Sequence, residues 1–171
     1  MKMLSQHECE EWLKANVGPT VTLENVEDGY PHRVSYSMPV DTGKKTALAH
    51  YVTHYSSIDV RQPGLFWITL HGVWPSSENM AIFDGYRSSL GETRPLDEAP
   101  GLVFDHTDLQ ALECLLALTL YFYWDSSLLD GAGKVLFKTG HDEWLSVCAK
   151  DEAHLARFVD TLDRLKLTRR Q

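Results

Sequence analysis

The chain lacks the short motifs that mark the best-known catalytic and cofactor-binding sites. Its three cysteines, Cys9, Cys114 and Cys148, form no CxxC pair, which argues against a disulfide framework and against a paired-cysteine zinc site. No serine lies in a Gly-x-Ser-x-Gly segment, so the sharp turn that presents a hydrolase nucleophile is not expected. Gly43-Lys44 lacks the earlier glycine that a phosphate-binding loop needs. The sequence therefore predicts no bound cofactor.

Lysine and arginine are scarce in the middle of the chain. Between Val73 and Asp130 the only basic residues are Arg87 and Arg94, against ten acidic ones. The acids are Glu78, Asp84, Glu92, Asp97, Glu98, Asp105, Asp108, Glu113, Asp125 and Asp130. This stretch carries the whole net charge of -8, because the remaining 14 acids and 14 bases cancel. An acidic middle argues against nucleic-acid binding, whose footprint is clustered Lys and Arg. It suits a basic protein partner, or charge that only keeps the protein in solution.

Long apolar runs are also missing. The most apolar stretch, residues 109–120, is shorter than the roughly 20 residues that a membrane-spanning helix needs. Met1–Leu4 leads directly into a helix start at Ser5, so no signal peptide is expected. Together with the unpaired cysteines, this predicts a cytoplasmic protein that does not cross a membrane. A length of 171 residues with 43% hydrophobic content predicts a single domain, residues 1–171.

The stretch from Thr107 to Lys150 is expected to organise the fold. Thr107 and Gln110 fit a capping box, and the helix that follows, 107–120, is apolar on nearly every side, which predicts burial all round. The aromatic segment 121–124 favours a strand. Asp130-Gly131-Ala132-Gly133 favours a hairpin loop. Return strands at 135–138 and 144–149 would complete an antiparallel meander.

Hydrophobic periodicity predicts the remaining elements. Strand 33–40, helix 44–56 and the apolar strand 65–71 read as a crossover joining two parallel strands. Helices are expected from Ser5 to about Asn16, over 77–89, and from Asp151 onward. The predicted fold is an α+β domain with a mixed sheet of five to seven strands, a C-terminal antiparallel meander, and four or five helices packed against the sheet.

Histidines and carboxylates supply the only candidates for chemistry. His50 and His54 stand four apart on a predicted helix, but the glutamate of an HExxH zinc motif is missing, so no metal site is predicted there. His71, at the end of an apolar strand, and His141-Asp142-Glu143, at a strand junction, could form a hydrolase site, with or without a divalent metal. The alternative is that Asp142 caps a turn, because adjacent residues on an extended chain point apart.

Two segments carry a family resemblance. Trp74-Pro75-Ser76-Ser77-Glu78-Asn79 and His141-Asp142-Glu143-Trp144 resemble a group of uncharacterised bacterial proteins, over roughly the second half of the chain. The resemblance implies a bacterial cytoplasmic protein. It implies nothing about mechanism.

The leading hypothesis from the sequence is a non-catalytic binding protein whose acidic face engages a protein partner. Glu92, Asp97, Glu98 and Trp74 are the candidate binding residues. A toxin-neutralising immunity protein is one concrete version, because a small acidic domain suits a basic, nuclease-like toxin. The alternatives are a small hydrolase around His71 and His141, and a subunit of an oligomer anchored by exposed tryptophans.

Overall fold

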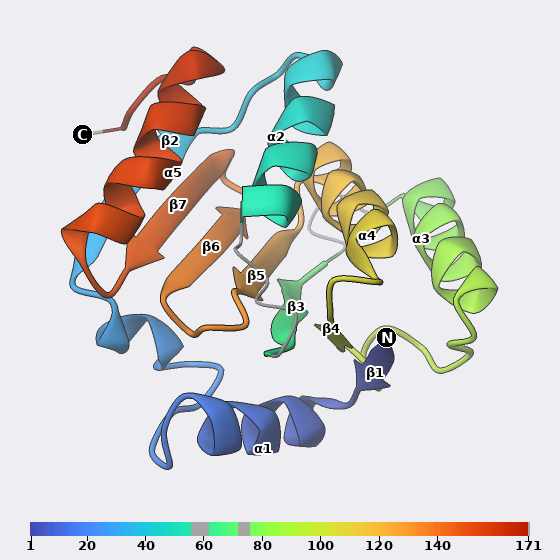
Figure 1. Cartoon of the computed structure of the whole chain (residues 1–171). Coiled ribbons are helices and arrows are strands. Elements are labelled where there is room, and N and C mark those ends of the chain that lie inside the picture. Colours follow the sequence, from blue (N-terminus) through green and yellow to red (C-terminus); the bar gives the residue numbers. More distant parts are fainter. Residues whose placement is uncertain (56–61, 72–75, 171) are drawn as a thin grey trace.

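The computed structural model describes residues 1–55, 62–71 and 76–170 (Figure 1). These residues form five α-helices, a short 3-10 helix and seven strands. In chain order the elements are β1 (Lys2–Leu4), α1 (Gln6–Asn16), η1 (Val26–Gly29), β2 (His32–Ser37), α2 (Thr42–Tyr55), β3 (Gly64–Leu70), α3 (Ser77–Ser89), β4 (Gly101–Phe104), α4 (Leu109–Phe122), β5 (Asp125–Leu129), β6 (Val135–Gly140), β7 (Trp144–Ala149) and α5 (Glu152–Arg164). The predicted α+β class is confirmed. None of the helices in the described residues combines the length and apolar character needed to cross a bilayer.

The seven strands form one sheet in the order β1-β4-β3-β5-β6-β7-β2. Every pairing between neighbouring strands is antiparallel, so the predicted mixed sheet with a parallel β2–β3 pair is wrong. β2 and β3 do run in the same direction, but the meander β5–β6–β7 lies between them. The strand–helix–strand order of the predicted crossover is confirmed, but its two strands do not pair. The three strands between β2 and β3 come from a segment about 60 residues further along the chain. The hydrophobic pattern of residues 33–71 contains no information about that segment.

Helices cover the two faces of the sheet unequally, as Figure 1 shows. The larger core joins one face of the sheet to α2, α3, α4 and α5, and includes Leu48, Phe83, Leu116 and Phe158. The smaller core joins the other face to α1 and η1, through Cys9, Leu13 and Val26. Side chains alternate between the two cores along a strand: in β3, Leu65 and Trp67 enter the smaller core, and Phe66 and Ile68 enter the larger one.

The boundaries of α4 differ from the prediction. The helix runs to Phe122, because the apolar helical pattern continues into the aromatic segment, and Tyr123 ends it with a left-handed conformation (φ 54°). The strand therefore begins only at Asp125. At the other end Asp108 is the N-cap residue, and the Thr107 hydroxyl donates to Asp105 instead of capping. The predicted capping box at Thr107 is wrong. The helix start predicted at Ser5 is confirmed, and Ser5 forms a capping box with Glu8.

The β5–β6 hairpin turns where the sequence predicts. The carboxylate of Asp130 accepts hydrogen bonds from the main-chain N–H groups of Lys134 and Val135 at 2.6 and 2.9 Å. Gly133 adopts a left-handed conformation (φ 62°), which glycine tolerates without strain. The C-terminal meander is thus confirmed: β6 and β7 start at the predicted residues 135 and 144, whereas β5 starts only at Asp125, after the predicted strand 121–124.

Candidate functional site

One end of the sheet collects most of the predicted catalytic residues. Because the strands alternate in direction, the C-terminal ends of β3 and β6 and the N-terminal ends of β4 and β5 meet there. His71 follows β3, Asp97 lies in the loop before β4, Asp125 begins β5, and His141 follows β6. Residues far apart in the sequence are therefore brought to one edge by the antiparallel order of the sheet.

His71 is held by a carboxylate and an aromatic ring. Its Nε2 lies 2.7 Å from Asp97 Oδ1, and its ring centroid lies 5.6 Å from that of the buried Trp124. A cavity of about 310 Å³ lies beside this pair and is lined by Gln6, Ile68, Thr69, Leu70, His71, Leu96, Asp97 and Pro100. The described residues that line this cavity do not include His141, Asp142 or Glu143. The predicted catalytic residues thus share an edge of the sheet without converging on this cavity.

His141 forms a second histidine–carboxylate pair. Asp125 Oδ1 accepts from the main-chain N–H of His141 at 2.6 Å and lies 2.8 Å from His141 Nδ1. This hydrogen bond raises the pKa of His141 above its ordinary value. Asp142 is exposed, and its Oδ1 lies 3.7 Å from His141 Nε2. Asp125 therefore orients the imidazole ring, because it is within hydrogen-bond distance of the ring whereas Asp142 is not.

The His141–Trp144 segment is the turn between β6 and β7. Glu143 has a left-handed conformation (φ 60°), and its carbonyl accepts a hydrogen bond from the main-chain N–H of Met38 at 2.7 Å. The carbonyl of Asp142 accepts from Arg170. Glu143 therefore ties the turn to the residue after β2, and Asp142 ties it to the C-terminal end of the chain. Among the described residues, no main-chain N–H donates to the Asp142 side chain, so the turn cap that the sequence suggested is not found there.

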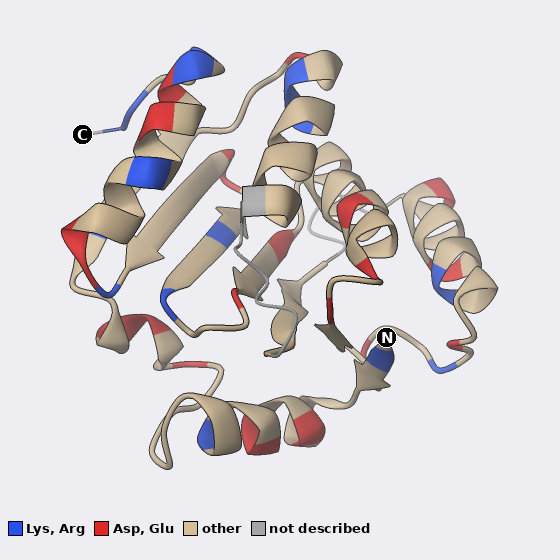
Figure 2. Cartoon of the chain, viewed as in Figure 1, with Lys and Arg blue, Asp and Glu red and all other residues tan. Residues whose placement is uncertain are grey.

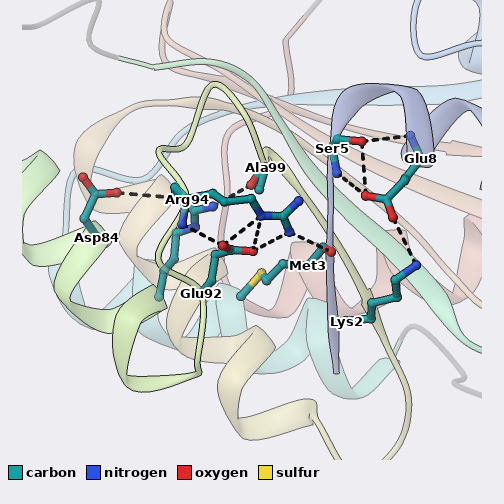
Figure 3. A network of polar contacts seen from close by, with 9 residues as sticks. Lys2, Met3, Ser5, Glu8, Asp84, Glu92, Arg94 and Ala99 are labelled. Atoms are coloured by element: carbon teal, nitrogen blue, oxygen red, sulfur yellow. Dashed lines mark hydrogen bonds and ion pairs between the residues drawn. The ribbon is translucent and has the colours of Figure 1, made fainter.

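Glu92, a predicted binding residue, is built into the structure. It is 8% exposed, and Arg94 donates to both of its carboxylate oxygens from Nε and Nη2 and to Oε1 from its main-chain N–H (Figure 3). These bonds lower the pKa of Glu92 to about 2. Arg94 also donates to the carbonyl of Met3, so the pair ties β1 to the loop after α3. Glu92 is therefore not part of an exposed acidic face, which corrects the prediction for this residue.

The other predicted binding residues lie elsewhere. Asp97 and Glu98 are both exposed in the loop between α3 and β4. Trp74 lies outside the described residues. Figure 2 shows acidic residues on α3, on α4 and in the loops next to them, whereas basic residues gather at the start of α2 and at the C-terminal end of the chain.

An open apolar groove runs between α3 and α4. It measures about 520 Å³ and is lined by Ile82, Gly85, Tyr86, Ser89, Cys114, Ala117, Leu118 and Tyr121. Within each helix these residues recur at i, i+3, i+4 and i+7, so each helix presents one continuous stripe. Ile82 is 54% exposed. Sequence reasoning missed this groove because each stripe alone is typical of a helix face that is buried in the core.

A cluster of possible metal ligands lies between α2 and α4. Glu113 Oε2 is 3.1 Å from His50 Nδ1 and 3.4 Å from His54 Nε2. One ligand atom from each residue can be chosen so that all three lie within 4.8 Å of one another. The sequence predicted no metal site here because the glutamate of an HExxH motif is missing; the third ligand comes instead from a helix about 60 residues away.

No protein-family model, curated protein or solved structure matches this chain. The resemblance of residues 74–79 and 141–144 to a group of bacterial proteins stays a prediction.

Proposed function

We propose that the chain is a non-catalytic binding protein, and that the groove between α3 and α4 receives a basic amphipathic helix from a protein partner. The observation that carries the proposal is the pair of apolar stripes that face each other across the groove. An amphipathic helix buries its apolar face in such a groove, with anchors at i, i+3, i+4 and i+7. This surface differs from the one expected from the sequence, since none of the lining residues is among the predicted Glu92, Asp97, Glu98 and Trp74.

The charge around the groove selects the partner. The only Lys or Arg on α3 and α4 is Arg87, which is 2% exposed and donates to main-chain carbonyls. Of the three carboxylates on these helices, Asp84 lies 3.5 Å from Arg87 and Glu113 faces His50 and His54 of α2, which leaves Glu78 beside the groove. Glu78 lies one helical turn before Ile82 and therefore on the same face of α3. A carboxylate beside an apolar groove favours lysine or arginine on the flank of an incoming helix.

A toxin-neutralising immunity protein is one concrete form of this proposal. A basic nuclease-like toxin would present the positive surface that Glu78 favours. If the chain is an immunity protein, its partner is a basic nuclease, and the activity of that nuclease falls in proportion to the amount of this chain added.

Affinity capture with matched variants tests the proposal. Ile82→Glu places a charge in the groove, Glu78→Lys reverses charge beside it, and Val40→Glu makes the same kind of change as Ile82→Glu at a residue that is 80% exposed outside the groove. We expect one stoichiometric partner that is retained by wild type and by Val40→Glu but lost from Ile82→Glu. Retention by Glu78→Lys should weaken and depend less on salt. Equal retention by all four proteins would refute the groove.

Cys114 reports directly on whether the groove is occupied. It is exposed and lines the groove, whereas Cys9 and Cys148 are buried. Iodoacetamide should therefore label one thiol in the native protein, and a bound partner should slow this reaction. A partner that binds at full stoichiometry without slowing the labelling of Cys114 binds elsewhere. If the groove instead binds a second copy of this chain, light scattering would show the mass of a dimer.

A hydrolase site is the second candidate, and the His141–Asp125 pair supports it. A carboxylate on Nδ1 fixes the imidazole and leaves Nε2 to exchange protons with a substrate or a water. The test is a panel of ester, peptide and phosphate substrates with wild type and His141→Ala. Activity that survives in His141→Ala, or no activity in wild type, would refute it.

A further inference from the structure

The two histidines of α2 and Glu113 of α4 form a three-point set of ligand atoms. His50 and His54 are four residues apart, so both rings project from one side of α2, and their centroids lie 4.4 Å apart. Both rings direct a nitrogen at the same oxygen, Oε2 of Glu113, at 3.1 and 3.4 Å. Two imidazole nitrogens and a carboxylate oxygen this close together can bind the same cation.

The distances fit tetrahedral coordination. Zinc bonds to histidine nitrogen and carboxylate oxygen are roughly 2.0–2.2 Å long, so two donors at the tetrahedral angle are about 3.3–3.5 Å apart. The two nitrogen–oxygen distances of 3.1 and 3.4 Å lie at or just below this range. One nitrogen of each ring can be chosen so that the two lie within 4.8 Å of each other, and rotating the imidazole rings can shorten this separation.

We propose that His50, His54 and Glu113 bind a divalent transition-metal ion of the zinc class, with a fourth coordination position open to water. Two imidazoles and one carboxylate match the ligand preference of zinc, whereas calcium and magnesium prefer sites made wholly of oxygen. The side chains are 56%, 44% and 27% exposed respectively, so an ion and its water reach the site from solvent.

The core holds the two helices in place beneath this site. Leu48 and Val52 of α2 and Leu112 and Leu116 of α4 belong to the same buried cluster. The spacing between the three ligands is therefore set by close packing below them, and binding requires only side-chain adjustment. A bound ion joins α2 to α4, a role separate from the partner-binding groove on the other side of α4.

The experiment uses the full chain, stripped with a chelator and titrated with zinc chloride by calorimetry at neutral pH. Wild type should bind one equivalent, and zinc should raise its thermal midpoint. His50→Ala, His54→Ala and Glu113→Gln should each weaken binding at least about tenfold, because loss of even an outer-shell partner costs about 10- to 100-fold. The control is His106→Ala, an exposed histidine beside Asp105 at 3.9 Å, which should bind zinc like wild type.

Cobalt gives a readout of geometry. Cobalt(II) in a four-coordinate site shows intense visible absorption bands, and these should appear in wild type and in His106→Ala but not in Glu113→Gln. Circular dichroism checks that each variant is folded, as expected for partly exposed side chains. The proposal is overturned if wild type shows no saturable binding, or if Glu113→Gln binds zinc as wild type does. A loss of stability in the variants without any zinc binding in wild type would identify a histidine–carboxylate ion pair and also overturn it.

Discussion

Replacing Glu92 by Gln should destabilise the protein in a pH-dependent way. The Glu92 carboxylate is nearly buried and accepts three side-chain hydrogen bonds and one main-chain hydrogen bond from Arg94. Its pKa falls from 4.5 to about 2, and at about 1.36 kcal/mol per pH unit this corresponds to about 3 kcal/mol. Arg94 is 40% exposed, and solvent screening reduces the expected loss for Glu92→Gln at pH 7 to about 2 kcal/mol.

The direction of the pH dependence follows from the lowered pKa. The folded state binds the proton of Glu92 more weakly than the unfolded state, so the contribution is fully present above about pH 4.5. It is lost as the pH falls toward about 2. The difference in unfolding free energy between wild type and Glu92→Gln should therefore be constant from pH 7 to 5. At pH 3 it should be less than half of that value.

Urea unfolding followed by tryptophan fluorescence at pH 7, 5, 4 and 3 measures this difference. Glu98→Gln is the matched control: it removes the same charge from an exposed residue of the same loop, and its effect should stay within about 0.5 kcal/mol. The reasoning is refuted if Glu92→Gln costs less than about 0.5 kcal/mol at pH 7, or if its cost is the same at pH 3 and pH 7.

Two further predictions concern packing and the sheet end. A Cβ on Gly101 would lie 2.0 Å from Cys9 Sγ, so Gly101→Ala should cost about 1–3 kcal/mol of stability. Adding Cys9→Ala should recover part of this loss, and purely additive effects in urea unfolding would contradict the contact. The Asp125 hydrogen bond raises the pKa of His141, so this pair stabilises the fold below the unfolded pKa of the histidine and ceases to do so as the pH rises through the folded one. In an NMR titration Asp125→Asn should lower the pKa of His141, whereas Asp142→Asn should change it much less; the reverse order would mean that Asp142 orients the ring.

Local chemistry was sufficient to predict several elements of this fold. Helix α3 spans the predicted residues 77–89, and α5 begins at Glu152, directly after the predicted start at Asp151, whose side chain accepts from the main-chain N–H of His154. The Asp130–Gly133 turn lies where predicted. Helix caps, β-turns and periodic helix faces depend on residues that are close together in the chain, so the local sequence is enough to predict them.

Boundaries were less well determined where two local signals competed. The aromatic residues after Leu120 favour a strand by propensity, yet Tyr121 and Phe122 continue α4. Phe122 packs against the larger core, and the Tyr121 hydroxyl hydrogen-bonds to Thr42 and Thr46 of α2. These tertiary contacts outweigh an intrinsic preference that spans only about 1 kcal/mol. The same limit applies at Thr107, where the residue pattern of a capping box occurs without its hydrogen bonds.

The sequence by itself determined the α+β class, the excess of acid in the middle of the chain, and the absence of familiar catalytic motifs. Only the tertiary structure decided the strand order, the choice of Asp125 as the partner of His141, the burial of Glu92 against Arg94, and the approach of Glu113 to His50 and His54. Each of these depends on which distant segments pack together. Such pairings are set by the fit of whole faces in the core, which the spacing of residues along the chain does not encode.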